Sequence, residues 1–227
     1  MKNPSCKDCE CKSPLFHYLT TRELKLIDSV RYTVFYNPGE TIFKQGTPAT
    51  HVLSFTSGLA KATIETVNNN ELILRLIKPS EFVAGPGLYV DNLHHYSIIA
   101  LVPSRVCVID KKVFLELLES NKIFARSYYE KVHRNYVMLI NRLASVSYKQ
   151  SRGKVAEVVV SLYKELGVNR KFQLPFSMGE MAAYAGVSKE SVYKVLQEFA
   201  LENLLRVTNR EVELLEPGKL EEISLLG

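Results

Sequence analysis

The sequence predicts an α+β protein: an N-terminal antiparallel β-roll of the double-stranded β-helix or jelly-roll type, a long dimerisation helix and a C-terminal winged helix-turn-helix. Three observations predict it. Short β-rich runs separated by turn residues fill 31–110, an apolar seam of period 3.5 runs through 123–148, and two capped helices joined by a glycine turn occupy 176–202. The expected domains are a sensory roll at 1–120, a dimerisation and signalling helix at 121–150, and a DNA-binding domain at 151–227.

The N-terminal segment carries three cysteines, Cys6, Cys9 and Cys11, in the sequence CKDCEC. A first helix is predicted over 20–30, because Thr20 followed three residues later by Glu23 is the pattern of a capping box.

Between residues 31 and 110 the sequence changes to short runs rich in β-branched and aromatic residues, bounded by glycine, proline and asparagine. The runs lie at 31–36, 41–44, 51–56, 59–67, 71–77 and 97–110. Strands at this spacing indicate an antiparallel barrel or roll.

One long helix is predicted over 123–148. Its apolar residues are spaced 4-3-4-3-4-3, which is a period of 3.5, and they are Ala125, Tyr129, Val132, Tyr136, Leu139, Leu143 and Val146. Such a seam is typical of a coiled coil, although a core helix within one subunit also carries one. We interpret the seam from Tyr129 to Val146 as the interface of a homodimer.

The C-terminal domain is predicted from a helix-turn-helix pattern. Ser177 and Glu180 form a second capping box, Gly186 suits the turn, and Ser188 caps a helix that continues to residue 202. The strand, turn and strand of 204–215, with Asn209-Arg210 at the turn, add a wing.

Polar residues gather on the outer face of the second of these helices. Lysine donates to guanine and glutamate accepts from cytosine, so this face is suited to base edges, whereas an ordinary helical hairpin would carry a merely solvated polar face. The candidate DNA-binding residues are Ser177, Ser188, Lys189, Glu190, Tyr193, Lys194 and Gln197.

The charge of the chain agrees with a polyanionic partner. The formal net charge is +5, and residues 121–150 hold six Lys and Arg against one acidic residue, whereas 198–227 hold three against seven.

The composition, 46% hydrophobic and 23% charged, is that of a globular protein, with no apolar run long enough to span a membrane and no secretion signal. We expect a cytoplasmic protein with reduced thiols.

The order of these parts resembles the CRP/FNR family of bacterial transcription regulators, named for the cyclic-AMP receptor protein and the fumarate–nitrate regulator. The roll shares the family's glycines, as at Pro38-Gly39 and Gly58, and GVSKESVYKVL is similar to its recognition helix. The resemblance implies that Glu190 reads a base edge and that a basic residue, here Lys194, lies one turn later. It also implies RNA polymerase as a further partner.

The family's cyclic-nucleotide pocket is altered in this chain. The resemblance places a Gly-Glu pair and an Arg-Ser pair where the ungapped alignment has Ala84-Gly85 and His95-Tyr96. A neutral imidazole cannot replace a permanently charged guanidinium against a phosphate diester, so cyclic AMP is not the expected effector. A small apolar or weakly acidic ligand is the alternative, in a pocket formed by Ala84, Gly85, His95, Tyr96, Leu139 and Ile140.

The resemblance to the oxygen-sensing branch of the family implies a different signal. There, three N-terminal cysteines and one on the last strand of the roll hold an iron–sulfur cluster, which implies Cys6, Cys9, Cys11 and Cys107 as ligands. The spacing C-x2-C-x-C is shorter than that of the oxygen sensor. Zinc, redox-active thiols, and a metal-free chain with Cys107 packed as a small hydrophobe stay open.

Other functional classes find less support. The sequence carries no glycine-rich phosphate loop, no G-x-S-x-G and no H-E-x-x-H, and its histidines do not form a cupin-like metal set. His94 and His95 are interpreted as exposed loop residues. The competing hypothesis is a dimeric roll that binds a small molecule and does not bind DNA.

Overall fold

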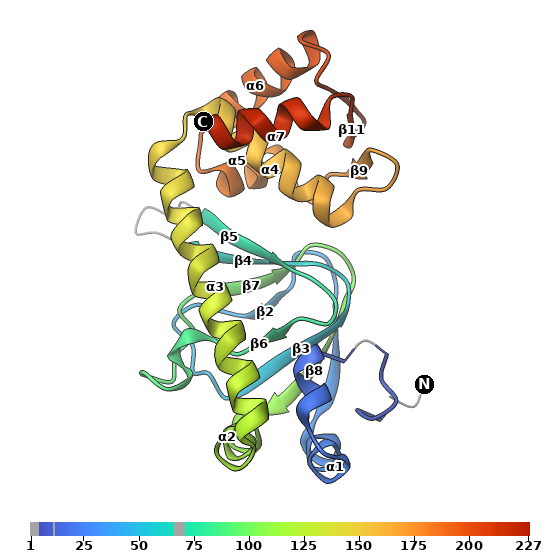
Figure 1. Cartoon of the computed structure of the whole chain (residues 1–227), viewed down its shortest axis with the longest axis vertical. Coiled ribbons are helices and arrows are strands. Elements are labelled where there is room, and N and C mark those ends of the chain that lie inside the picture. The colour runs from blue at the N-terminus through green and yellow to red at the C-terminus, as the bar shows by residue number, and fades with distance from the viewer. Residues whose placement is uncertain (1–4, 11, 66–70) are drawn as a thin grey trace. The chain divides into compact units, whose positions relative to one another are not determined.

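The computed structural model describes residues 5–10, 12–65 and 71–227, so Cys11 and the end of the strand predicted over 59–67 lie outside the described residues. The chain forms two compact units (Figure 1), Met1–Asn69 with Leu74–Val137, and Asn70–Ile73 with Met138–Gly227. The border between the units falls inside the long helix α3 (Lys122–Tyr148). The predicted α+β class, with its roll, long helix and winged helix-turn-helix, is confirmed.

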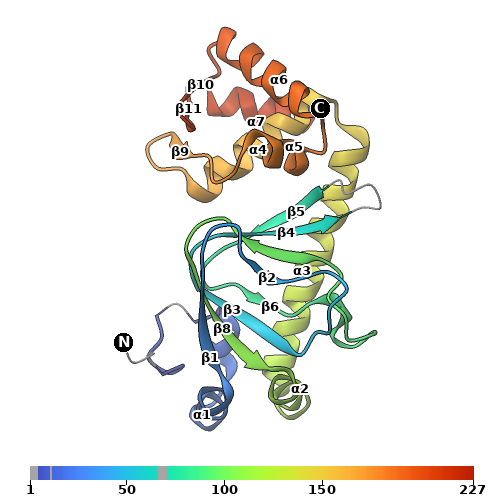
Figure 2. The ribbon, with the colours of Figure 1, turned by 180° about the vertical axis from the view of Figure 1, so that it is seen from behind.

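The roll consists of two four-stranded sheets (Figure 2). Their orders are β1-β8-β3-β6 and β2-β7-β4-β5. The strand bounds are β1 Tyr32–Tyr36, β2 Thr41–Phe43, β3 His51–Ser57, β4 Ala60–Glu65, β5 Glu71–Ile77, β6 Phe82–Val83, β7 Ser97–Ala100 and β8 Ser104–Asp110.

The two sheets enclose an apolar core because residues of both point inward. Phe55 and Val106 from the first sheet pack in one cluster with Ala62 and Ile98 from the second, all nearly without solvent exposure. Burial of this kind is the main favourable term in folding.

The predicted run 97–110 is not one strand, and that prediction is corrected. β7 pairs with β2 and β4 in one sheet, whereas β8 pairs with β1 and β3 in the other. The chain changes sheets at residues 101–103, where Pro103 has no N–H for a ladder. Gly58 lies against this crossing, and a Cβ on it would come within 2.2 Å of Ser104 Oγ.

Helices cover one side of the roll. They are the 3-10 turn η1 (Pro14–Tyr18), α1 (Thr21–Val30), α2 (Lys111–Ser120) and the first turns of α3, with a second 3-10 turn η2 (Pro86–Leu88) in the loop before β7. Phe114 of α2 contacts the rings of Phe82, Phe124 and Tyr128 with centroids 4.9, 5.9 and 5.2 Å apart. The capping box predicted at Thr20 and Glu23 begins α1.

The second unit contains the last turns of α3 and the winged helix-turn-helix. Its elements are α4 Ser151–Leu166, β9 Lys171–Gln173, α5 Met178–Ala185, α6 Lys189–Leu201, β10 Leu205–Thr208, β11 Glu211–Leu214 and α7 Pro217–Leu226. β9 joins the predicted hairpin in a sheet of order β10-β11-β9.

In the part of the chain that the structure describes, no helix has the length and apolarity that crossing a membrane requires.

Candidate DNA-reading surface and sensory sites

The turn between α5 and α6 follows directly from the local sequence. Ser177 accepts a hydrogen bond from the Glu180 amide at 3.2 Å, and the Glu180 carboxylate accepts one from the Ser177 amide at 2.8 Å. Gly186 ends α5 in the left-handed conformation, with φ of 69°. Ser188 then caps α6 by accepting from the Ser191 amide at 3.1 Å. The two helices and their caps are those predicted from the sequence.

The outer face of α6 is open to solvent. The exposed residues are those predicted to contact DNA on this helix and its cap, Ser188, Lys189, Glu190, Tyr193, Lys194 and Gln197. The Lys189 ammonium lies 5.9 Å from the centroid of the Tyr193 ring, within cation–π range. A backbone hydrogen bond, the Ser188 hydroxyl and the charge of Lys189 lower the pKa of Glu190. Ser177 is exposed too, but its hydroxyl is used in the capping box.

The opposite face of α6 is buried, and α4 supports it. Val192, Val195, Leu196 and Phe199 have almost no exposed surface. Arg152 of α4 pairs with Glu198 at 3.3 Å and with Glu202 at 2.6 Å, and its guanidinium lies 4.9 Å from the Phe199 ring centroid. These contacts fix the rotation of α6, so that the polar face stays outward.

The wing is a tight hairpin. Asn209 and Arg210 both have positive φ, 48° and 72°, which is the conformation of a two-residue turn that matches the twist of the strands. Arg206 of β10 pairs with Glu213 of β11 at 3.2 Å.

The last turns of α3 are attached to the DNA-binding unit. Arg142 donates a hydrogen bond to the Tyr184 carbonyl oxygen and lies over the Tyr184 ring. Glu157 of α4 accepts hydrogen bonds from Ser145 and from Lys149, the latter at 2.6 Å. Burial lowers the pKa of Arg142.

The predicted seam is exposed along most of its length. Tyr129, Val132, Tyr136, Leu139 and Leu143 are solvent-exposed, Leu143 by 68%. The two end positions differ. Ala125 is buried in the roll unit, and Val146 is half-buried, with its methyl groups 3.1 and 3.5 Å from the place of a Gly186 Cβ.

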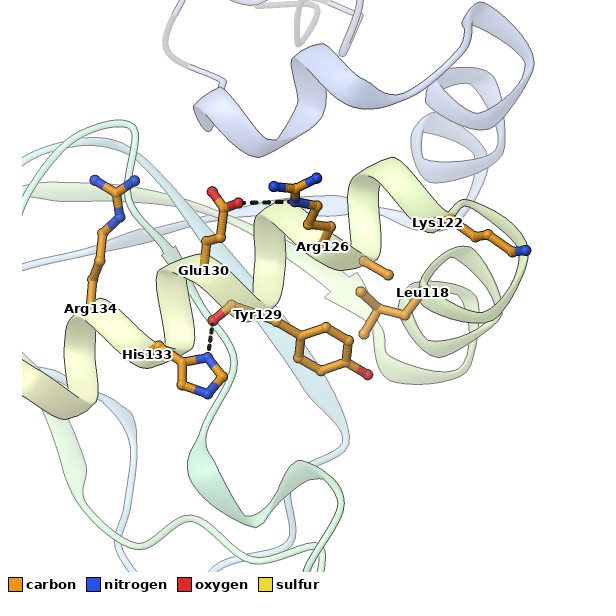
Figure 3. A pocket seen from close by; sticks show the side chains of 8 residues that line it. Leu118, Lys122, Arg126, Tyr129, Glu130, His133 and Arg134 are labelled. Carbon is orange, nitrogen blue, oxygen red and sulfur yellow. Dashed lines mark hydrogen bonds and ion pairs between the residues drawn. The ribbon is translucent and has the colours of Figure 1, made fainter.

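A hollow of about 630 Å³ lies beside Tyr129 on the part of α3 that belongs to the roll unit (Figure 3). Leu118 and Ala125 form its apolar part, and charged side chains surround it. Arg126 pairs with Glu130 at 3.3 Å, and His133 Nδ1 donates to the Tyr129 carbonyl oxygen at 2.7 Å.

The residues predicted for the ligand pocket are distributed differently. His95 is exposed and pairs with Asp91 at 3.1 Å, while Tyr96 is half-buried beside Phe43, with ring centroids 5.6 Å apart. Gly85 is buried and Ala84 half-buried. Leu139 and Ile140 belong to the other compact unit and are exposed there.

His94 is buried, so the prediction of an exposed loop residue is wrong for it. Its ring stacks on Phe43 with centroids 3.8 Å apart and an interplanar angle of 8°. Burial lowers its pKa, and its Nδ1 has no hydrogen-bond partner among the described residues. The place of a Gly85 Cβ lies 3.5 Å from that nitrogen, which is an ordinary van der Waals distance.

Three predicted cysteines line one small cavity in the roll unit. Cys6 and Cys107 are 5% and 7% exposed, and Cys9 is half-buried. Lys12 and Arg31 line the same cavity, which has about 10 Å³ of free volume, roughly the room of one water molecule. Among the described residues, no three cysteine, histidine or acidic side chains are close enough to hold one metal ion. The fourth predicted ligand, Cys11, lies outside the described residues.

Polar contacts fix the two buried cysteines. The Cys6 amide donates to both Asp28 carboxylate oxygens at 2.9 Å. Arg31 Nη1 donates to Cys107 Sγ at 3.6 Å, and the Thr33 hydroxyl lies 3.7 Å from the same sulfur. Burial and the hydrogen bond to Asp28 raise the pKa of the Cys6 thiol to about 12.

Both halves of the chain match family models. Residues 33–121 match the cyclic nucleotide-binding domain, and residues 153–223 match the Crp-like helix-turn-helix domain. The chain is 27% identical to the cyclic AMP receptor protein of Thermus thermophilus, over 93% of this chain and 97% of that protein. It is 27% identical to the transcriptional activator protein anr of Pseudomonas aeruginosa, over 95% and 90%.

The chain belongs to the CRP/FNR family of transcription regulators. The structure of FixK2 from Bradyrhizobium japonicum has the same fold, with a TM-score of 0.78 at 17% identity over 86% of this chain and 97% of that one. The protein is therefore a DNA-binding transcriptional regulator and belongs to a class without enzymatic activity.

Several residues around the sites of this CRP/FNR protein were not found from sequence. Arg152, Arg142 and Glu157 support the DNA-binding helices, and Asp28 and Arg31 support the cysteines. Their partners lie between 8 and 76 positions away in the chain, apart from the Asp28–Arg31 pair itself, so no local pattern connects them. For Arg142 and Arg152, the surplus of basic residues in 121–197 was an available signal.

Proposed function

We propose that the protein acts as a homodimer that reads an inverted-repeat operator and responds to a signal other than cyclic AMP, received either at its cysteines or by a small ligand in the roll. The alternative of a small-molecule-binding roll without DNA binding is disfavoured by the match to the Crp-like helix-turn-helix domain. The observation that carries the proposal is the combination of an open polar face on α6 with an exposed apolar seam on α3.

The exposed seam supports dimerisation. A row of exposed tyrosine, valine and leucine side chains at a period of 3.5 is costly in water and is removed from it when two such helices pair. Leu143→Glu should place a charge in that seam and produce monomers in sedimentation experiments. Asn141→Glu, on the opposite side of the same helix, is the matched control. A wild-type protein that sediments as a monomer would contradict the proposal.

Two recognition helices of a dimer would enter successive major grooves about 34 Å apart, so the operator is expected to be an inverted repeat with half-sites one helical turn apart. Glu190 and Lys189 are both exposed on α6. We assign Glu190 as an acceptor from a base, and Lys189 as a donor to a base or to a phosphate. Glu190→Ala should relax base choice, because the interaction that discriminates the base is lost. Lys189→Ala should weaken binding at every sequence.

A mobility-shift series on a randomised inverted repeat tests both assignments. Lys219→Ala, an exposed lysine on α7, is the control for the loss of one positive charge. If neither α6 variant differs from the control, the residue assignment is refuted. Because lysine is a less directional donor than arginine, no bidentate guanine contact is assigned to Lys194.

The cysteines are proposed as the sensory site. Three thiols line one cavity with two basic side chains, which could offset the negative charge of thiolate ligands. Among the described residues no three ligating side chains lie close enough to hold one metal ion, so a thiolate-bound metal would require the sulfurs to be brought together. Cys6, Cys9 and Cys107, with Cys11, would hold the group, and an iron–sulfur cluster would supply sensitivity to oxygen and redox state. The cavity of about 10 Å³ has no room for a cluster in the described arrangement.

Anaerobic reconstitution with iron and sulfide, followed by visible absorbance, tests the cluster. Colour that is lost in Cys107→Ser supports it. A colourless protein whose four thiols all react with a thiol reagent would remove the cluster, and zinc binding measured on the same sample distinguishes a zinc site. Cyclic AMP is not proposed as the effector, since neither Gly85 nor His95 offers the family's charged groups.

The signal would act on the joint between α3 and α4, at residues 147–151. The bonds from Arg142, Ser145 and Lys149 now tie the end of α3 to the DNA-binding helices, so any movement at this joint has to break them. RNA polymerase is proposed as a further partner and the cytoplasm as the location, as in regulators of this kind.

A further inference from the structure

The cavity that Cys6, Cys9 and Cys107 share suits a direct bond between two sulfurs. It has about 10 Å³ of free volume, roughly the room of one water molecule. Residues that line so small a cavity face each other across about one water diameter. A disulfide needs no atom between the sulfurs and only requires the two Cα atoms to come within about 4.4–6.8 Å.

The three thiols differ in exposure and in reactivity. Cys9 is half-buried, so a small oxidant can reach it from solvent, whereas Cys6 and Cys107 are 5% and 7% exposed. Burial and the hydrogen bond to Asp28 raise the pKa of the Cys6 thiol to about 12. Because the thiolate is the reactive form of a cysteine, Cys6 is the least suited of the three to react.

The Cys107 sulfur has a fixed positive charge beside it. Arg31 Nη1 donates to Cys107 Sγ at 3.6 Å, and the Thr33 hydroxyl lies 3.7 Å from the same atom. The Arg31 side chain is only 8% exposed, and Asp28 holds its Nε at 2.8 Å. A guanidinium held in this way offsets the negative charge that a sulfur carries when it attacks. Cys107 is therefore the sulfur placed to act as the nucleophile.

The chain is anchored on both sides of Cys9. Before it, the Cys6 amide donates to both Asp28 carboxylate oxygens at 2.9 Å. After it, the Lys12 amide donates to the Cys9 carbonyl oxygen at 3.3 Å, and η1 packs into the core of the roll unit. These anchors keep Cys9 at the edge of the cavity, close to the last strand of the roll.

We propose that Cys9 and Cys107 form a reversible disulfide when the protein meets a hydroperoxide. One peroxide oxygen is transferred to the Cys9 sulfur, the O–O bond breaks, and water or an alcohol leaves, so that Cys9 becomes a sulfenic acid. The Cys107 thiolate then attacks the Cys9 sulfur, and the S–S bond forms. The hydroxide that leaves takes up the proton released by Cys107. Two electrons pass from the two sulfurs to the peroxide, and a thiol reductant reverses the bond by exchange.

The inference rests on the cysteine branch of the proposed function and gives it a reaction that needs no metal. The bond would join residues 98 positions apart in the sequence. In an unfolded chain Cys9 would pair more readily with Cys6 or Cys11, because a short loop closes at a lower entropic cost than a long one. A preference for Cys107 would therefore be a property of the folded roll.

Peroxide treatment of the full-length, reduced and metal-free protein tests the inference. The remaining thiols are alkylated after an equimolar dose of hydrogen peroxide, and a non-reducing digest is analysed by mass spectrometry. The expected product is a peptide pair joined through Cys9 and Cys107 of one chain, with two of the four thiols lost. Cys9→Ser and Cys107→Ser should each abolish this pair. Cys6→Ser, which removes the third thiol of the cavity, is the matched control and should keep it.

Two further variants separate the steps. In Cys107→Ser the sulfenic acid at Cys9 loses its attacking sulfur, so the sulfenic-acid reagent dimedone should label Cys9. Arg31→Gln removes the charge beside Cys107 and should slow the joining without changing its product. Arg22→Gln, on the exposed face of α1, should join at the rate of the wild type. Equal rates in both arginine variants would overturn the role of Arg31.

Each contrary result overturns a defined statement. Four thiols that all remain open to alkylation, or oxidation beyond sulfenic acid without a joined pair, overturn the disulfide. A pair joined through Cys6 or Cys11, or between two chains, overturns the assignment of Cys9 and Cys107. Operator binding by the reduced protein is measured separately. Its absence would contradict the DNA-reading proposal and leave the disulfide standing, so the two failures are distinguishable.

Discussion

The two units build their functional sites in different ways. In the DNA-binding unit, the side chains that face outward come from one short helix and its cap, and one capping box, one serine N-cap and one left-handed glycine position them. In the roll unit, the cysteine site draws on segments 22 and 76 positions apart. The first kind of site depends on residues that are close together in the sequence. The second forms only where the folded roll brings its strands and the N-terminal segment together.

The largest expected effects come from removing a buried ring in one unit at a time. Phe199 lies on the buried face of α6 and Phe55 lies in the core of the roll, both without solvent exposure. Either Phe→Ala substitution should cost about 3–5 kcal/mol of unfolding free energy through lost burial and a cavity. Hydrogen exchange should show loss of protection in α6 for Phe199→Ala and in β3 for Phe55→Ala. Equal loss in both units from either variant would contradict independent units.

Gly186 tests how strictly the local sequence sets the α5–α6 turn. With φ of 69° and the Val146 methyl group 3.1 Å from the place of a Cβ, Gly186→Ala should cost about 1–2 kcal/mol in denaturant unfolding. Gly218→Ala is the control, since its Cβ would meet no atom within 4 Å. Equal stability of the two variants would show that the left-handed turn is not required.

The capping boxes allow a matched comparison between the units. Thr20→Ala in the roll unit and Ser177→Ala in the DNA-binding unit each remove an acceptor for a helix amide, at a cost of about 1 kcal/mol. Thr20→Ser and Ser177→Thr keep the hydroxyl and should restore most of the stability. Ser177→Ala should in addition weaken operator binding, whereas Thr20→Ala should not. A loss of operator affinity in Thr20→Ala would show coupling between the units.

The smallest effect concerns acid pH. Burial opposes ionisation of Glu23, but hydrogen bonds from Thr20 and Asn121 lower its pKa below the usual value of 4.5. The hydrogen bond from Arg152 lowers the pKa of Glu202 in the other unit. A carboxyl group with a lowered folded-state pKa contributes stability above its unfolded pKa and loses it as pH falls through the folded value.

Thermal midpoints should therefore fall more steeply below about pH 4.5 in the wild type than in Glu23→Gln or Glu202→Gln, because the amides do not titrate. Identical acid profiles for the wild type and both variants would contradict these assignments. Glu222→Gln, an exposed residue of α7, is the control.

The fold was predictable wherever one physical pattern covered a whole element. The seam of period 3.5 gave α3 to within one residue, and Ser177, Gly186 and Ser188 placed α5 and α6. The run 97–110 was wrongly predicted as one strand. The alternation of side chains and the β-propensity are the same in β7 and β8, although the two strands join different sheets. His94 was misjudged for a related reason. Whether a loop imidazole is exposed depends on a distant aromatic ring, here Phe43.

The sequence by itself determined the class of the protein, the bounds of the helix proposed to face DNA and the chemical types of the groups on it, because helix caps, turns and amphipathic faces depend on neighbours within a few residues. Only the tertiary structure decided that three cysteines share one cavity, that Asp28 and Arg31 contact two of them, Cys6 and Cys107, and that Arg152 supports α6. Those contacts depend on the pairing of β1 with β8 and on the packing of α4 against α6. Contacts between segments that are far apart in the sequence leave no signal in the local sequence.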